Sequence, residues 1–142
     1  MTDQKGFRIE VSSRFEEFWR YNVAMTGGLF DARGERIGFA STEDTVAETG
    51  ANLRRKPEDY PRDRTIVLET APCQRLRLFV YLIPHTLPAG NTVADSRPFE
   101  LQVAIRCGGR PLRTERFAVN QWSGASLELQ LEAQPPQRPA AE

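Results

Sequence analysis

One stretch of the sequence, residues 97–107, alternates between apolar and polar side chains. Its apolar members are Phe99, Leu101, Val103, Ile105 and Cys107. Successive side chains of a strand point to opposite faces, so a period of two buries one face and exposes the other to water. The polar residues between them, among them Glu100 and Gln102, fall on the exposed face. This stretch is therefore predicted to be a strand with one face in a hydrophobic core.

Alternation of this kind recurs along the chain, and long amphipathic helical patterns do not. The other candidate strands are residues 7–11, 21–25, 65–70, 75–83, 112–119 and 126–131, with a hairpin over residues 30–39. Strands joined by short turns, without helices between them, pair antiparallel and pack as two sheets. We predict a mostly β fold, an antiparallel two-sheet β-sandwich of about eight strands with at most one or two short helical turns.

Two segments depart from strand alternation. Ser13 and Glu16 have the spacing of a capping box, which predicts one helical turn there, with a continuing strand as the alternative. Residues 42–63 show no period and are predicted to form a long loop, with a short helix from Ser41 as the alternative. The pair Gly27-Gly28 predicts a bulge or a sharp bend.

Length and charge limit the classes of protein to consider. At 142 residues the chain is predicted to be one domain over residues 1–133, followed by a Pro-rich tail at 134–142 that cannot pack as a strand. The 19 basic and 19 acidic residues cancel, which argues against binding to nucleic acid or an anionic membrane. We see neither a signal peptide nor a segment approaching the ~20 apolar residues of a membrane span, so we expect a cytoplasmic protein.

His85 is the one histidine, so catalysis by a histidine base would have to use it. Cys73, a possible nucleophile, lies at the other end of the strand predicted over residues 75–83. An extended chain of this length separates the two by roughly 35–40 Å, too far for a Cys-His pair. We expect His85 to lie on a surface loop and the protein not to be an enzyme.

Cys73 and Cys107 would reach the same sheet end if residues 75–83 and 99–107 paired as neighbouring strands. In that register the two side chains point to opposite faces, which a disulfide cannot bridge. We therefore expect free thiols. Two cysteines and one histidine without close spacing do not predict a zinc site, and acidic pairs such as Glu43-Asp44 lack the ligand spacing of a calcium loop. No metal or cofactor is expected.

The strand over residues 75–83 carries the clearest functional signal. From Phe79 onward both of its faces are apolar, because Phe79, Tyr81 and Ile83 alternate with aliphatic residues. A strand that is apolar on both faces is covered on both sides. We expect the cover to come from the chain itself, from residues 15–19 or the long loop. A binding partner is the alternative, since exposed apolar patches mark interfaces.

These patterns predict a non-enzymatic interaction module, a structural or adaptor subunit of a larger assembly that binds another protein or a second copy of itself. The basic run in the long loop could hold a phosphate or an acidic partner, although neighbouring carboxylates largely neutralise it. The candidate interaction residues are Phe79, Tyr81, Ile83, Arg54, Arg55, Lys56 and Tyr60. The alternative is a sandwich that binds a carbohydrate, lipid head group or peptide through the loop residues Tyr60, Trp122 and His85. We do not favour a small-molecule ligand.

Overall fold

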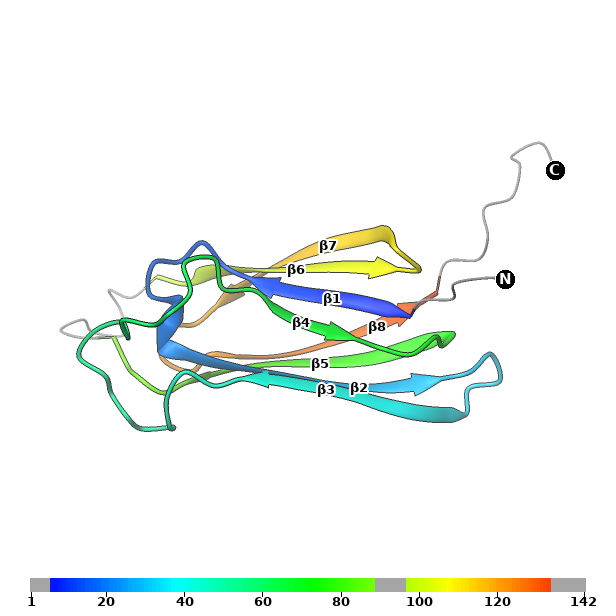
Figure 1. Cartoon of the computed structure of the whole chain (residues 1–142), viewed down its shortest axis with the longest axis horizontal. Helices are drawn as coiled ribbons and strands as arrows, with labels where there is room; N and C mark the ends of the chain where they lie inside the picture. The colour runs from blue at the N-terminus through cyan, green and yellow to red at the C-terminus, as the bar shows by residue number, and fades with distance from the viewer. Residues whose placement is uncertain (1–5, 89–96, 134–142) are drawn as a thin grey trace.

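The computed structural model describes residues 6–88 and 97–133, which form two packed antiparallel sheets (Figure 1). The strands are β1 (Phe7–Ser12), β2 (Tyr21–Phe30), β3 (Arg36–Asp44), β4 (Ile66–Glu69), β5 (Arg75–Pro84), β6 (Phe99–Cys107), β7 (Arg110–Val119) and β8 (Ala125–Glu132). The first sheet has the order β4-β1-β6-β7 and the second the order β3-β2-β5-β8. The predicted β-sandwich of about eight strands is confirmed. The described residues contain one helical element, a 3-10 turn η1 (Phe18–Arg20).

The core lies between the two sheets and is built by the alternation seen in the sequence. In β6, Leu101, Val103 and Ile105 are buried on the inner face, while Glu100 and Arg106 are exposed. In β5 the inner side chains are those at even positions, from Leu76 to Leu82. Each fully buried aliphatic side chain contributes roughly 1.5–3 kcal/mol to folding, which makes this core the main source of stability.

The chain passes repeatedly from one sheet to the other, so strands that follow each other in sequence often lie in different sheets (Figure 1). β5 pairs with β2 and β8, while β6 pairs with β1 and β7. The pairing of residues 75–83 with residues 99–107 that we considered is therefore wrong. Both hydrogen-bonding edges of β5 are occupied within the second sheet, and β6 belongs to the first.

Cys73 and Cys107 are both free, as expected, but the strand pairing on which our parity argument rested is absent. Our parity argument placed the two side chains on opposite faces of one sheet. In the structure both are half-buried against the core. Burial raises the pKa of the Cys73 thiol above its usual value, so the reactive thiolate is disfavoured in the folded chain.

The segment between β1 and β2 does not contain the predicted capping box. The hydroxyl of Ser13 donates to the carbonyl oxygen of Glu100, at 2.6 Å, instead of capping a helix. The ring of Phe15 then stacks on Phe99, with centroids 4.3 Å apart, and Phe18 packs edge-on against the same ring. This aromatic contact closes one end of the core, and the chain makes only the short turn η1 before entering β2.

The glycines of β2 form neither the bulge nor the bend that we predicted. β2 runs through Gly27 and Gly28 without interruption, and its irregularity lies one step later, between Leu29 and Phe30. A side chain at position 27 would come within 2.7 Å of the Leu76 Cδ1 atom. Glycine is needed there because the core of the sandwich is too close for a Cβ atom.

The long loop begins after Asp44, because residues 41–44 belong to β3 and not to the alternative helix. Asn22 of β2 holds the loop: its side-chain oxygen accepts from the amide of Val46 and its Nδ2 donates to the carbonyl of Ala47, both at 2.6 Å. Further on, the amide of Asn52 donates to the carbonyl oxygen of His85. The loop is thus tied to the second sheet through its backbone.

Two further sequence predictions concern the Pro-rich C-terminal tail and membrane-spanning segments. The Pro-rich segment 134–142 lies outside the described residues, as do residues 1–5 and 89–96. Over the described part of the chain, no helix is long and apolar enough to cross a membrane.

Candidate functional site

The outer face of the second sheet is the side of β3, β2, β5 and β8 that points away from the core. Strand register places its residues in rows across the sheet. Phe79 of β5 lies beside Thr26 of β2, and Tyr81 lies beside Ala24. Phe39 of β3 lies beside Gly28. Large side chains on β3 and β5 therefore flank a β2 strand whose outer residues are small between positions 24 and 28.

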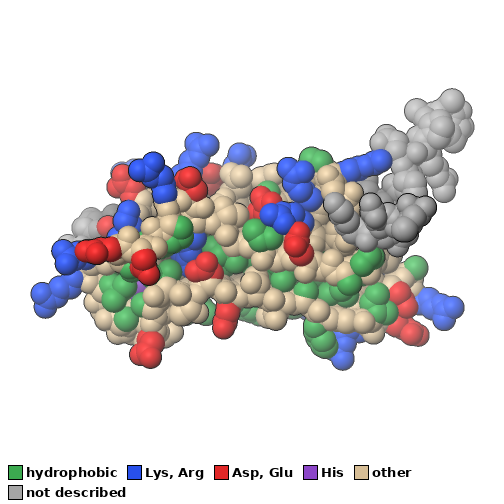
Figure 2. Space-filling view, in the orientation of Figure 1, with side chains coloured by type: hydrophobic (Ala, Val, Ile, Leu, Met, Phe, Trp, Pro, Cys, Tyr) green, Lys and Arg blue, Asp and Glu red, His purple; other side chains and the backbone are tan. Residues whose placement is uncertain are grey.

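Several apolar side chains on this face reach the solvent. Phe39 is 70% exposed, Ile37 is 54% exposed and Ile83 is 41% exposed, while Phe79 and Tyr81 are half-buried. Of the large apolar residues of the described chain that are exposed, only Leu87 belongs to a loop rather than to this face. Figure 2 shows hydrophobic side chains at the surface over β2 and β3. Apolar residues gathered on one face, rather than scattered singly, indicate an interaction surface.

Aromatic contacts fix the shape of the face. The rings of Phe79 and Tyr81 stack with centroids 6.4 Å apart. The Arg77 guanidinium lies over the Phe79 ring at 5.2 Å, and the Arg36 guanidinium lies over the Phe39 ring at 4.4 Å. Such cation–π pairs contribute about 0.5–1 kcal/mol at exposed sites. These contacts favour the observed positions of the aromatic side chains in the free chain.

The expected internal cover of this face is not found in the segment over residues 15–19. Phe15 and Phe18 pack against Phe99 at the end of the core instead. The long loop reaches the face at Asn22, beyond the aromatic pair. The sequence correctly indicates a strand with two apolar faces, but Ile83 at its end remains exposed to solvent.

Charges on the outer face come in both signs. Arg77 forms an ion pair with Glu128 across β5 and β8, at 2.7 Å. One row further along, Arg75 lies beside Glu132. Arg36 and Glu43 lie toward opposite ends of β3. The face as a whole is close to neutral, so it has no preference for a strongly acidic or strongly basic partner.

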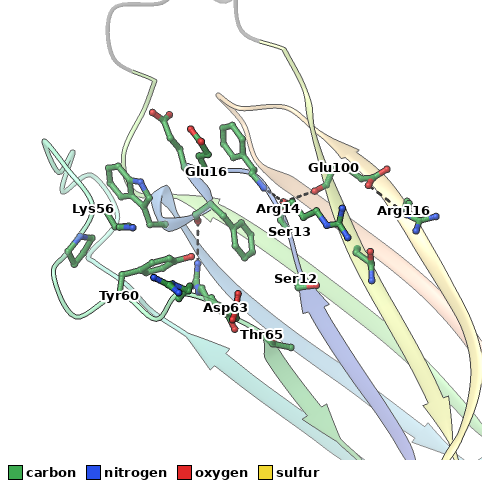
Figure 3. Close-up of a pocket in the computed structure, with 18 of the residues that line it drawn as sticks. Ser12, Ser13, Arg14, Glu16, Lys56, Tyr60, Asp63, Thr65, Glu100 and Arg116 are labelled. Atoms are coloured by element: carbon green, nitrogen blue, oxygen red, sulfur yellow. Dashed lines mark hydrogen bonds and ion pairs between the residues drawn. The ribbon is translucent and has the colours of Figure 1, made fainter.

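A second candidate site is a polar hollow of about 1320 Å³ at one end of the sandwich. It lies between the residues that follow β1, the second half of the long loop, and β6 and β7 (Figure 3). Five basic and five acidic side chains line it: Arg14, Lys56, Arg62, Arg64, Arg116, Glu16, Glu17, Glu58, Asp63 and Glu100. Because the charges balance, the hollow selects neither anions nor cations by net charge.

Arg64 is a buried part of the wall of this hollow. Its Nη1 donates to the carbonyl oxygen of Tyr21 at 2.9 Å, and its Nη2 donates to the carbonyl oxygen of Asp44 at 3.0 Å and to the Asp44 carboxylate at 3.1 Å. The guanidinium lies between the rings of Phe18 and Tyr60. Its Nε is buried without a hydrogen-bond partner. The guanidinium joins the long loop to β2 and β3, which gives this residue a structural role.

His85 is buried, and the prediction of a surface histidine is wrong. It is 1% exposed, with Nε2 2.7 Å from the carbonyl oxygen of Trp19 and Nδ1 2.7 Å from the Thr86 hydroxyl. A carbonyl only accepts, so Nε2 carries the proton and Nδ1 accepts from Thr86. Burial lowers the pKa of His85, and the charges of Arg64 and Arg20 lower it further. Both ring nitrogens are used inside the protein, and neither is open to a ligand.

The residues predicted from the sequence to make contacts divide between the two places. Phe79, Tyr81 and Ile83 lie on the outer face. Lys56 and Tyr60 line the hollow, whereas Arg54 and Arg55 are exposed on the loop outside its lining. Trp122, from the alternative ligand-binding set, does not line the hollow either.

Sequence reasoning missed Ile37 and Phe39. A signal was present: both alternate with the small residues Gly38 and Ala40, as they would in a strand that turns its large apolar side chains outward. Among the described residues, no group of three or more His, Cys, Asp or Glu side chains could hold a metal ion.

Comparison with known proteins yields two solved structures. One is a protein of the DUF4425 family from Bacteroides ovatus, with a TM-score of 0.38 and 8% sequence identity, covering 89% of this chain and 93% of that one. The other is a domain of unknown function, DUF4425, from Bacteroides vulgatus, with a TM-score of 0.37 and 12% identity, covering 90% of this chain and 93% of that one. No family model matches the sequence, and no curated protein matches it.

Proposed function

We propose that this protein is a non-enzymatic interaction module that binds another protein chain through the outer face of its second sheet. The observation that carries the proposal is the exposure of Phe39, Ile37 and Ile83 on one continuous face. The outer face of a simple sandwich is polar, because it meets water. Here aromatic and aliphatic side chains occupy positions that would be polar in a module without a partner.

The composition of the face supports protein binding. Aromatic residues and arginine are enriched at the centres of protein interfaces, and the face combines Phe79 and Tyr81 with Arg77 and Arg36. These side chains stand on strands, so the backbone that carries them is already ordered before a partner binds. The balanced charges fit a partner surface that is mainly apolar with a mixed polar rim.

The environment of His85 supports a binding role over histidine-based catalysis. A general base must reach the proton of its substrate, directly or through one water. His85 is buried, with Nε2 and Nδ1 both bonded to protein atoms, so it has no free nitrogen to offer. In this proposal His85 stabilises the connection after β5 and has no part in chemistry.

The test uses a double variant that makes the face polar, Phe39→Ser with Ile83→Ser. Leu87→Ser is the matched control, because Leu87 is 44% exposed but lies outside the sheet. Chains that co-purify with the tagged wild-type protein from its native cells are produced separately, and their affinities are measured. The proposal expects a chain whose affinity falls about tenfold or more with the double variant and is unchanged with Leu87→Ser. Equal binding by all three proteins would contradict it.

The alternative function is binding of a carbohydrate, lipid head group or peptide by the loops. The observation in its favour is the polar hollow, whose lining includes the half-buried ring of Tyr60. Of its original residues Tyr60 alone lines the hollow, and His85 is buried. Isothermal titration with oligosaccharide, phospholipid head-group and peptide panels tests it. Binding that Tyr60→Ala abolishes, with the double outer-face variant unaffected, would favour the hollow over the outer face.

A further inference from the structure

The shape of the outer face points to a specific partner, and the inference rests on the proposed function. Phe79 and Tyr81 form a ridge along β5. Immediately beside it on β2 lie the small residues Ala24 and Thr26, whereas the ring of Phe30 lies against the next outer position, Gly28. The face therefore carries two large side chains on β5 and two small ones on β2, side by side and in register.

We propose that the partner is a second copy of this chain, related by a two-fold axis that runs parallel to the strands between β2 and β5. Such an axis lays β5 of each copy over β2 of the other, and β8 over β3. Residues of one row then oppose residues of the same row. The Phe79 ring meets Thr26 of the second copy, and Tyr81 meets Ala24. Sheets packed face to face lie about 10 Å apart, which this alternation of large and small side chains fills.

The same axis also matches the charges. Arg36 lies at the level of Phe30 on β3, and Glu132 lies at the level of Arg75 on β8, while Phe30 and Arg75 are themselves neighbours. These four residues form one row across the sheet. The axis therefore brings Arg36 of one copy to Glu132 of the other, twice in the dimer. It also places Arg75 over the Phe30 ring of the second copy, a cation–π arrangement.

In no row of the proposed dimer do two like charges of opposite copies face each other. In the next row inward, Phe39 meets Gln130 of the second copy and Gly28 meets Arg77. Beyond it, Glu128 meets Ser41. An isologous interface must be complementary to itself, and a face with like charges in corresponding positions would be excluded by repulsion.

The size of the outer face limits the area that the dimer can bury. Four strands spaced about 4.8 Å apart and rising about 3.3 Å per residue present about 550 Å² in projection. Two copies then bury about 1,100 Å², close to the lower limit of specific interfaces. We therefore expect a reversible dimer that dissociates on dilution.

Charge reversal provides the test, because it leaves the core untouched. Arg36→Glu and Glu132→Arg are made separately, and Arg110→Glu on β7 is the control on the first sheet. The association constant of each full-length chain is measured by sedimentation velocity over a concentration series. We expect wild type and Arg110→Glu to dimerise equally, and each outer-face reversal to weaken self-association by about tenfold or more.

Mixing the two reversed chains is the decisive step. Arg36→Glu and Glu132→Arg should form a heterodimer together, because both contacts are then again between opposite charges. Arg110→Glu mixed with Glu132→Arg has the same net charges but one repulsive contact, so it should associate more weakly than the first mixture.

Three outcomes would overturn the second copy as partner. They are a wild-type chain that stays monomeric at every concentration, a dimer that the outer-face reversals leave unchanged, and a mixture that does not restore association. Binding of a different chain, lost with Phe39→Ser and Ile83→Ser, would in each case still support the proposed function. If, in addition, no chain binds in a way that depends on Phe39 and Ile83, both the second copy as partner and the proposed function are overturned.

Discussion

The ring of Phe79 stacks on the ring of Tyr81 on the outer face of β5, with centroids 6.4 Å apart and ring planes within 7° of parallel. Residues two apart on a strand point to the same side, so this contact is built by the strand itself. It turns two half-buried side chains into one rigid ridge beside the small residues of β2. The ridge is the feature from which the proposed pairing with a second copy of the chain follows.

Replacement of Phe79 by alanine should cost the isolated chain about 1–2 kcal/mol of unfolding free energy. The side chain is half-buried, so the cost lies between the ~0.5 kcal/mol of a surface change and the ~3–5 kcal/mol of a buried aromatic. Phe99→Ala is the matched control, because Phe99 is 7% exposed and contacts three other aromatic rings. Urea melts should show the larger loss for Phe99→Ala. Equal losses would mean that something covers Phe79 within the chain.

Removal of the Arg64 guanidinium should detach the long loop. Arg64→Ala leaves several carbonyls and the Asp44 carboxylate without their donor, which we expect to cost about 3 kcal/mol or more. Lysine should not restore the stability, because it lacks the planar fork of donors. Arg62→Ala, at an exposed position of the same loop, should change stability by less than about 0.5 kcal/mol. Hydrogen exchange should speed up over residues 45–60 in Arg64→Ala and stay slow in the control.

His85 should make the free energy of unfolding depend on pH in an interval that lies above the one in which carboxylates titrate. Its pKa in the folded chain is lowered by burial, so the unfolded chain binds the proton more readily. Stability is then complete above the unfolded pKa of about 6.5 and falls as the pH drops below it toward the folded pKa. The denaturation midpoint of the wild-type chain should fall as the pH is lowered from 8 to 5.5.

The control is His85→Gln, which removes the titrating group of the one histidine in the chain. This variant should be less stable at pH 8, because it disturbs the bonds to Trp19 and Thr86, yet nearly independent of pH over the same interval. A wild-type midpoint that rises on acidification would contradict the sign of the shift.

Both cysteines should be free, and folding should slow the reaction of Cys73. In unfolded, unreduced chain a thiol reagent should modify Cys73 and Cys107 alike. In the folded chain Cys73 should react more slowly than in the unfolded chain, because burial raises its pKa and reduces the thiolate fraction. Detection of no reactive thiol in the unfolded chain would show a disulfide and refute the assignment.

Alternation in the sequence is enough to find the strands, because it states which side chains of a strand face the core. It does not state which strand is the neighbour, and for that reason the pairing of residues 75–83 with residues 99–107 was wrong. The choice of neighbouring strand depends on contacts between residues far apart in the sequence, which a local pattern does not reveal. Phe15 and Phe18 meet Phe99 at the end of the core, although Phe99 is distant from both in sequence.

The environment of His85 shows the same limit for a single polar residue. Its position after a strand and between Pro84 and Thr86 is typical of a surface loop. Its burial depends on the carbonyl of Trp19, 66 residues earlier, which only the folded chain brings within reach. The outer-face residues Phe79, Tyr81 and Ile83 could be found because their signal lies within one strand, whereas Ile37 and Phe39 belong to the face only through the pairing of β3 with β2.

The measurement that tests the binding face most directly is oxidative footprinting of the protein in its native cells, compared with the purified chain at high dilution. Phe39, Tyr81 and Ile83 report on the outer face, and Leu87 reports on an exposed apolar side chain elsewhere. The proposal predicts that oxidation of the three outer-face residues falls several-fold in the cell, while oxidation of Leu87 is unchanged. Equal oxidation of Phe39 and Ile83 in both settings would show that the outer face remains open to water, and would contradict the proposed function.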